Sequence, residues 1–409
     1  VSFRFRDDSS NRLDFYSESN GAGVNLRTNR SFRDLSAWYH IVLSVDTTLA
    51  TADDRMKMYV NGVQETSFAL RTNPSLNENL NFNNSGNGQY IARAVGTETD
   101  RMFDGSMTHI HFIDGTAYDA STFGETDSTT GIWKPKTAPS VTYGTNGFFL
   151  KGENSGALGT DSSGNANNFT VNGTPTQTIS SPSNVFATMN PLVKSGSPTY
   201  ANGNTTVATI GDNDSVVSTF GVSNMKYYYE AKLLQTYDGS GGGIDIGGLR
   251  EEQFNASGFN SGTWSGFNNA YTKFYGNGND GKLKQGPGNV VTAGLTRAVA
   301  GDIVMIAIDP ANNRVYAGIN GTWLNSSDPV AGTGYIGGTQ ATGTGNWFAF
   351  ISSDIDKGNC NVNFGNGFFG TTAVASAQNP DDGIGIFEYD VPAGYRALCT
   401  KSINAQEYS

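Results

Sequence analysis

Two alternating apolar segments, each closed by an Asn-Gly dipeptide, constrain the fold of this chain more than any other feature. In the first, every second residue is apolar: Tyr39, Ile41, Leu43 and Val45 in residues 38–46, then Met56, Met58 and Val60. Such alternation places these side chains on one face of a β-strand. Asn61-Gly62 readily supplies two successive positive φ values, so we predict that the second strand turns back there as a tight hairpin.

The same order of features returns in the second half of the chain. A strand over 303–308 ends at Asp309, and an Arg-led strand over 314–319 runs into Asn320-Gly321. We interpret the two copies as related sandwich domains; two unrelated sheets that share common hairpin chemistry are the alternative. Further strands are expected over 226–234, 244–249, 347–352 and 360–364, and one short helical turn after Asp119.

Composition narrows the class of protein. Of 409 residues, 52 are Gly and 12 are Pro, while 15% are charged and 11% aromatic, which excludes long helices and ordinary disorder and favours an all-β fold. The net charge of −11 argues against nucleic-acid binding, and no run approaches the ~20 apolar residues of a membrane span. Because the chain begins at Val1, with no initiator Met or signal peptide, we expect a portion of a longer polypeptide.

The chain has two cysteines, Cys360 and Cys399, so no disulfide framework organises the fold. Cys360 falls in an alternating strand, where a small buried thiol is the commoner explanation. Pairing of the two cysteines is the alternative.

Several motifs of the first half resemble the laminin-G or concanavalin A-like sandwich found in virion proteins of marine bacteriophages. They are Ala37-Trp38-Tyr39-His40-Ile41-Val42, Phe103-Asp104-Gly105-Ser106 and residues 109–115, followed by 123–125, 131–136 and 143–148. In the second half, residues 226–230, 301–304, 320–323 and 362–365 resemble a SPRY domain, and 392–398 resembles the segment that ends it in the same phage proteins. In those phage proteins further strands usually precede the first sandwich and the chain often continues past the position of Ser409, so we expect that N-terminal strands of the first domain are missing.

The resemblance implies two concanavalin A-like/SPRY-like antiparallel β-sandwich (jelly-roll) domains in tandem. We place the laminin-G-like domain at 1–150, a Gly/Asn/Ser/Thr-rich connector at 151–183, the SPRY-like domain at 184–400 and a C-terminal tail at 401–409. The implied function is a non-enzymatic virion component, namely a tail fibre, appendage or capsid decoration. The alternative is a bacterial adhesin or a carbohydrate-binding module of a larger secreted enzyme.

No motif indicates catalysis. A glucanase of this architecture needs paired carboxylates on one strand face. The segment that comes nearest to this pattern, around Asp245, contains only one acidic residue. His109 and His111 should point the same way on a strand, as half a metal site or, in the interpretation we favour, as its polar face. Calcium is left unassigned, because the candidate aspartates (Asp53, Asp54, Asp100, Asp104, Asp212 and Asp214) lack a ligand-loop pattern.

The candidate site is a set of loops rich in aromatic residues and amides. Rigid aromatic faces beside Asn and Ser suit sugar binding, although half of these aromatics could equally be sandwich core. The chosen residues are Tyr237, Asp238, Trp264, Phe267, Tyr271 and, after the Asn-Gly turn, Trp323. The expected partners are a host-surface glycan and other virion proteins, with a homotrimer suggested by analogy to phage fibres, and the expected location is an extracellular virion.

Overall fold

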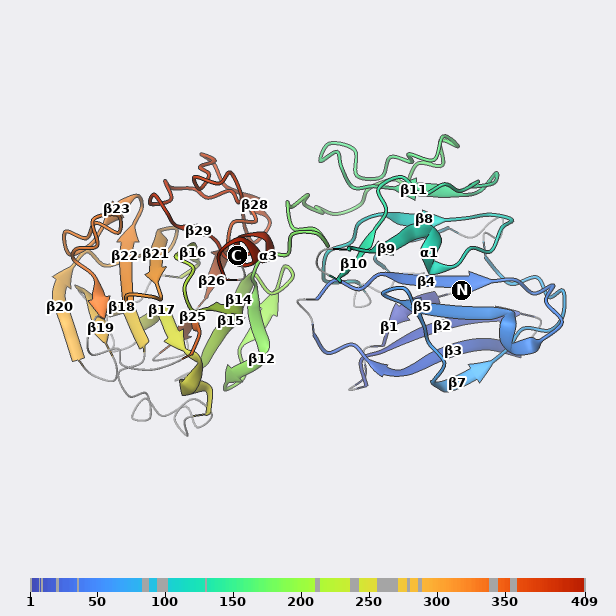
Figure 1. Cartoon of the computed structure of the whole chain (residues 1–409), viewed down its shortest axis with the longest axis horizontal. Helices are drawn as coiled ribbons and strands as arrows, with labels where there is room; N and C mark the ends of the chain where they lie inside the picture. Colours follow the sequence, from blue (N-terminus) through green and yellow to red (C-terminus); the bar gives the residue numbers. More distant parts are fainter. Residues whose placement is uncertain are drawn as a thin grey trace. The chain divides into compact units, whose positions relative to one another are not determined.

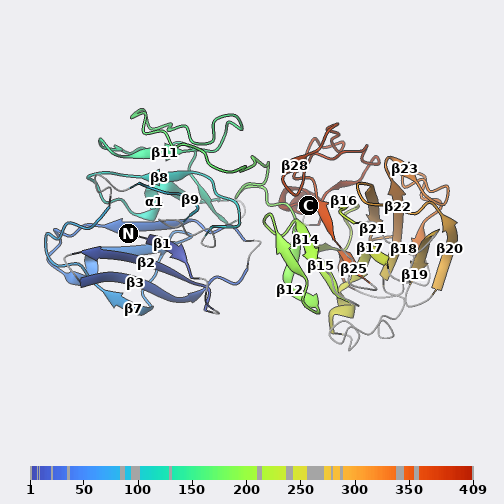
Figure 2. The ribbon, with the colours of Figure 1, turned by 180° about the vertical axis from the view of Figure 1, so that it is seen from behind.

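The structure is a computed structural model, which describes residues 2–6, 8, 10–19, 22–34, 37–82, 88–93, 102–128, 131–209, 214–235, 243–255, 271–277, 280–285, 289–337, 345–353 and 359–407. The chain forms two compact units, Val1–Gln177 (unit 1) and Thr178–Ser409 (unit 2). Both are built from antiparallel sheets (Figures 1 and 2), which confirms the predicted all-β fold of tandem sandwiches. None of the helices in these residues is long and apolar enough to cross a membrane.

Unit 1 packs two sheets around one core (Figure 1). One sheet has the order β1 (Ser2–Phe5), β2 (Arg12–Ser19), β3 (Ala22–Ser31) and β7 (Phe68–Thr72), and the other β4 (Ile41–Val45), β5 (Met56–Val60) and β6 (Val63–Gln64). The predicted alternating residues of β4 and β5 all face this core, opposite Leu13, Phe15, Val24 and Leu26. Burial of these apolar side chains from both sheets holds the sandwich together.

Shorter elements complete unit 1. Strand β8 (Ile110–Phe112) pairs with β11 (Phe148–Leu150), and β9 (Gly124–Thr126) pairs with β10 (Trp133–Pro135). The 3₁₀ helix η1 spans Ala52–Asp54 and the helical turn α1 spans Ala120–Phe123. Asp119 caps α1 by accepting a hydrogen bond from the Ser121 backbone N–H, as a helix N-terminus requires, so the predicted turn is confirmed.

Unit 2 also packs two sheets face to face. The first has the order β12 (Met189–Ser195), β15 (Ser215–Val222), β25 (Trp347–Ser353), β17 (Gly243–Arg250), β18 (Tyr271–Asn277), β19 (Asp280–Gln285) and β20 (Asn289–Leu295). The second has the order β13 (Thr199–Ala201), β14 (Thr206–Thr209), β26 (Cys360–Asn363), β16 (Tyr227–Leu233), β21 (Ile303–Asp309), β22 (Arg314–Ile319) and β23 (Thr322–Trp323), with β24 (Ile336–Gly337) beside β22 and β29 (Arg396–Ala397) beside β16. A small hairpin joins β27 (Phe368–Phe369) to β28 (Thr372–Ala373), and the 3₁₀ helix η2 spans Glu251–Asn255.

The second sheet of unit 2 is buried on both faces. Tyr227 and Tyr229 of β16 face the core between the sheets, whereas Tyr228 faces the opposite side. There the C-terminal part of the chain covers the sheet with Phe387, Tyr395 and other apolar side chains, and β29 pairs in parallel with β16 (Figure 1). The consecutive tyrosines 227–229 are therefore all buried, which alternation alone does not predict.

The two Asn-Gly turns have the same local structure in both units. Asn61 and Asn320 have φ values of 48°, and the glycines after them are also positive. Each Asn side-chain oxygen accepts a hydrogen bond from the backbone at the start of the strand that pairs with its own. Asn61 accepts from His40 N, just before β4, at 2.8 Å, and Asn320 accepts from Ile303 N of β21 at 2.9 Å. The predicted hairpins are confirmed, and each is locked to its neighbouring strand by the turn residue itself.

The structure also describes the cysteines, the segment between the predicted domains and the C-terminal tail. Cys360 and Cys399 are both buried and free, so they do not pair, and Cys360 lies in β26 as a buried thiol. The segment expected to connect the domains is ordered around Asp161, which accepts hydrogen bonds from the backbone of Phe149, Ser163 and Asn167. The tail contains helix α3 (Thr400–Glu407), which the sequence did not predict because it has little apolar periodicity.

Candidate functional site

The predicted aromatic loop falls largely outside the described residues. Tyr237, Asp238, Trp264 and Phe267 lie there. Tyr271 was placed in a loop, and this was wrong: it is the first residue of β18 and pairs with Leu249, because residues 271–277 continue the sheet beside β17.

Trp323 is only partly exposed. It lies in β23, directly after the Asn-Gly turn, as expected. Its ring contacts Tyr228 edge-to-face, with centroids 6.4 Å apart, and packs against the apolar cluster under the C-terminal segment. One side of Trp323 therefore stabilises unit 2, and its exposed remainder is what a ligand could contact.

A group of arginines on the outer face of unit 1 is a site that the sequence analysis missed. The register of the sheet places Arg4 of β1 and Arg27 of β3 on either side of Asp14 in β2. Leu13 and Phe15, the neighbours of Asp14, face the core, so this row lies on the opposite face. The signal that could have found it is the alternation Phe3-Arg4-Phe5-Arg6, which puts both arginines on one face of an edge strand.

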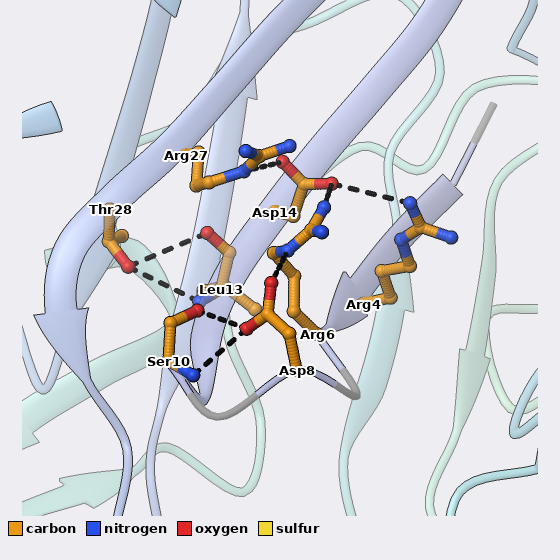
Figure 3. A network of polar contacts seen from close by, with 8 residues as sticks. All are labelled: Arg4, Arg6, Asp8, Ser10, Leu13, Asp14, Arg27 and Thr28. Carbon is orange, nitrogen blue, oxygen red and sulfur yellow. Dashed lines mark hydrogen bonds and ion pairs between the residues drawn. The ribbon is translucent and has the colours of Figure 1, made fainter. Parts of the chain in front are cut away.

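The three arginines surround a buried carboxylate (Figure 3). The Asp14 side chain is 1% exposed; its Oδ1 accepts a hydrogen bond from Arg27 Nε at 3.0 Å, and its Oδ2 lies 3.6 Å from an Arg4 Nη and 3.7 Å from an Arg6 Nη. The last two distances are ion pairs rather than hydrogen bonds. We call Arg4, Arg6 and Arg27 the arginine cluster.

Arg6 is held in place by a second carboxylate. Its Nε contacts Asp8 at 2.5 Å, and Asp8 also accepts hydrogen bonds from the backbone and the hydroxyl of Ser10 (Figure 3). The Ser10 hydroxyl and Arg6 hold the pKa of Asp8 down to about 2. Asp8 is therefore ionised at neutral pH and fixes the Arg6 guanidinium beside Asp14.

Unit 2 contains a buried carboxylate of a different kind. Glu230 is 0% exposed and accepts four hydrogen bonds: from Tyr228 Oη at 2.9 Å, Glu388 N at 3.0 Å, Tyr389 N at 2.9 Å and Asn363 Nδ2 at 3.3 Å. Burial raises its pKa to about 7, against the effect of these donors. The group ties the C-terminal segment to β16 and is not open to a substrate.

All three histidines belong to unit 1 and are partly buried. His109 and His111 both contact the Phe149 ring, with centroids at 5.6 and 3.9 Å, but only His111 lies in β8, because His109 precedes the strand with a φ of 52°. His40 accepts a hydrogen bond from Trp133 Nε1 at 3.0 Å. Burial lowers the pKa of each, and that of His111 to about 4, where the charges of His109 and His40 contribute.

The described residues do not assemble a metal site. No group of three His, Cys, Asp or Glu side chains among them could hold an ion. Of the calcium candidates, Asp53 contacts Arg71 and Asp54 contacts Lys57, while Asp100 and Asp212 lie outside the described residues. Asp245, the one acid in its strand segment, is buried and accepts a hydrogen bond from the Ser352 hydroxyl at 3.2 Å.

One protein-family model matches most of unit 1. Residues 1–121 match the concanavalin A-like lectin/glucanases superfamily. This match covers both sheets of the unit 1 sandwich, including the arginine cluster, and supports a binding or adhesion type of domain. No curated protein matches the chain.

Two solved structures similar to the chain are SPRY domains. One is that of human HERC1, with 13% identity over 42% of this chain and 96% of that one, at a TM-score of 0.30. The other is the PSpry domain of TRIM65, with 7% identity over 43% of this chain and 90% of that one, also at 0.30. The sandwich architecture of unit 2 rests on its own sheets and core.

Proposed function

We propose that this protein is a non-enzymatic virion component of a phage, a tail fibre, appendage or capsid decoration, that contacts host-surface glycan or a neighbouring virion subunit. The observation that carries the proposal is the match of residues 1–121 to a lectin-containing superfamily, on a chain made of two β-sandwiches. The phage assignment is supported by the sequence motifs that resemble marine phage virion proteins.

Three buried carboxylates stabilise the fold and are not placed to act on a sugar. Asp14 is enclosed by arginines, Glu230 by four donors, and Asp309 by Lys226 at 3.2 Å and the Asn312 side chain at 2.9 Å. Retaining or inverting glycosidases need two carboxyl groups that reach a sugar cleft together. These three carboxylates each serve the sheet that carries them.

A glycan array with the whole chain tests the binding function. We expect a restricted set of glycans to bind, and Trp264→Ala, Tyr271→Ala or Trp323→Ala to weaken binding. Val330→Ala, at a 60% exposed apolar residue outside the predicted set, is the matched control. Unchanged glycan affinity in all three aromatic variants would remove these three residues from the site.

The virion role needs a separate test. Antibodies against the chain should label phage particles at a repeated position in electron micrographs, and light scattering should show whether the chain is a trimer. A signal peptide or catalytic module in the full-length gene would instead favour the adhesin or enzyme-module alternative.

A further inference from the structure

We propose that the histidines of unit 1 form an acid-sensitive attachment, whose protonation releases two small sheets from the unit 1 sandwich. His40, His109 and His111 are the only histidines of the chain, and we call them the histidine group. The small sheets are the pairs β8–β11 and β9–β10 (Figure 1), and neither pairs with a strand of the sandwich in the described part of unit 1. Isolated two-stranded sheets are only marginally stable, so these two depend on side-chain packing against the rest of unit 1.

His40 attaches the β9–β10 sheet to the sandwich. It directly precedes β4, and its backbone N–H is fixed by the Asn61 side chain. Its ring Nδ1 accepts a hydrogen bond from Nε1 of Trp133 in β10 at 3.0 Å, and the Trp133 ring packs against Gly62, where an added Cβ would lie 2.4 Å from it. An indole N–H can only donate, so this bond requires a neutral His40 with its proton on Nε2. Protonation at Nδ1 would set two N–H groups against each other and break the contact.

His111 holds the β8–β11 sheet within a group of aromatic rings. It pairs with Phe149 across the two strands, and the ring centroids are 3.9 Å apart. The ring of Phe123, in α1, has its centroid 5.2 Å away, and His111 Nδ1 is 2.9 Å from the Tyr143 hydroxyl. Burial raises the pKa of Tyr143 to about 12, so it stays neutral. Because Phe123 and Phe149 are buried, a charge on His111 would lie among apolar groups, which is costly.

The three histidine rings also repel one another once they are charged. The pKa of His111 is lowered to about 4, first by burial and then by the charges of His109 and His40, so both lie close enough to act on it. Because burial lowers the pKa of His40 and His109 as well, each folded ring takes up its proton at a lower pH than an unfolded histidine does. The attachment is therefore complete above pH 6.5 and is lost as the pH falls towards 4.

Charged groups on the neighbouring elements leave this repulsion in place. Lys151 and Glu153, which follow β11, shift the pKa of His109 in opposite directions. The charged side chains in and beside the β9–β10 sheet form ion pairs with one another: Lys134 with Glu125 and Asp127. None of the ion pairs among the described residues joins a carboxylate to a histidine.

Hydrogen exchange of the whole chain, expressed as protection factors between pH 7 and pH 4.5, tests this attachment. We expect the protection of β8, β9, β10 and β11 to fall at least about tenfold, which corresponds to one pKa unit of proton linkage. That of β5, in the sandwich, should stay within about twofold. His40→Asn offers Trp133 a side-chain oxygen that does not titrate, so it should reduce the loss at β10. His111→Phe should reduce the loss at β8 and β11.

Glu153→Gln is the matched control, because it removes a carboxylate that acts on His109 and keeps all three histidines, so the loss should persist. The Cε1 signals of the three histidines, followed by NMR in the natural chain, give a readout that needs no variant, and we expect them to titrate below pH 6.5 together with the loss of protection. An equal loss at β5, a loss that survives both histidine variants or that Glu153→Gln abolishes, or histidines that titrate at pH 6.5 or above would each overturn the inference.

Discussion

The buried Glu230 of unit 2 gives a prediction with an unusual sign. Its pKa is raised to about 7 in the folded chain, against about 4.5 when exposed, so the folded state holds a proton that the unfolded state releases. Stability from this group is complete below pH 4.5 and is lost as the pH rises to 7. The size is about 2.5 pKa units, or about 3 kcal/mol at 1.36 kcal/mol per unit.

Glu230→Gln isolates this contribution. A glutamine resembles the protonated acid in shape and charge, but it does not titrate. We therefore expect the stability of the variant minus that of the natural chain to rise by about 3 kcal/mol between pH 4.5 and pH 8. At low pH the variant should be no more stable than the natural chain, because its amide group meets at least one of the four donors as a second donor.

The assay is urea unfolding at a series of pH values. Unfolding of unit 2 is monitored by pulse hydrogen exchange of peptides from β16. Taking the difference between the two chains cancels every other titrating group. Asp390→Asn, at an exposed residue of the same C-terminal segment, is the control and should give a flat difference. If the Glu230→Gln difference is also flat, or falls as pH rises, then the four donors hold Glu230 ionised and the reasoning is wrong.

Three more predictions concern unit 1 and the turns. Burial lowers the pKa of His111 to about 4, so its contribution to the stability of unit 1 is complete above pH 6.5 and is lost as the pH falls to 4. After discounting for its partial exposure, we expect this pH-dependent loss of stability to be about 1–2 kcal/mol. His111→Phe should abolish the loss in urea unfolding monitored at β8. Asn61→Ala and Asn320→Ala each remove a strand-locking hydrogen bond at a positive φ and should cost about 1–2 kcal/mol in thermal unfolding, with Gly at the same positions costing less. Asp161→Ala leaves several donors of residues 149–167 without an acceptor and should speed limited proteolysis of that segment, whereas Asp161→Asn should have a smaller effect.

Local sequence signals predicted the strands well. Alternation and Asn-Gly chemistry act over a few residues, so they identified β4, β5, β21 and β22 and the core faces of β4 and β5. Asp119 marked the helical turn α1. Strands β1 to β3 were not predicted. Their residues alternate, but many outward positions hold arginine or asparagine, and the Asn20-Gly21 dipeptide between β2 and β3 was a usable signal that was overlooked.

The arginine cluster could not be read from the sequence. Arg4, Asp14 and Arg27 are 10 and 13 positions apart, and they meet only because β1, β2 and β3 pair in one register. A shift of one residue in that pairing would turn Asp14 or its partners to the other face. The aromatic loop was chosen from composition alone, and composition does not show that Tyr271 continues a strand.

The run 226–230 of unit 2 shows why function and stability are hard to separate in such a sheet. An exposed sheet face would leave Tyr228 and Glu230 open to ligands, and a tyrosine beside a carboxylate there would suit sugar binding. Instead the C-terminal segment covers that face, and both Glu230 oxygens are saturated by donors. In unit 1 the outward carboxylate of Asp14 is paired with the side chains of Arg4, Arg6 and Arg27. An outward carboxylate is therefore buried by nearby arginine side chains in unit 1 and by a later segment of the chain in unit 2.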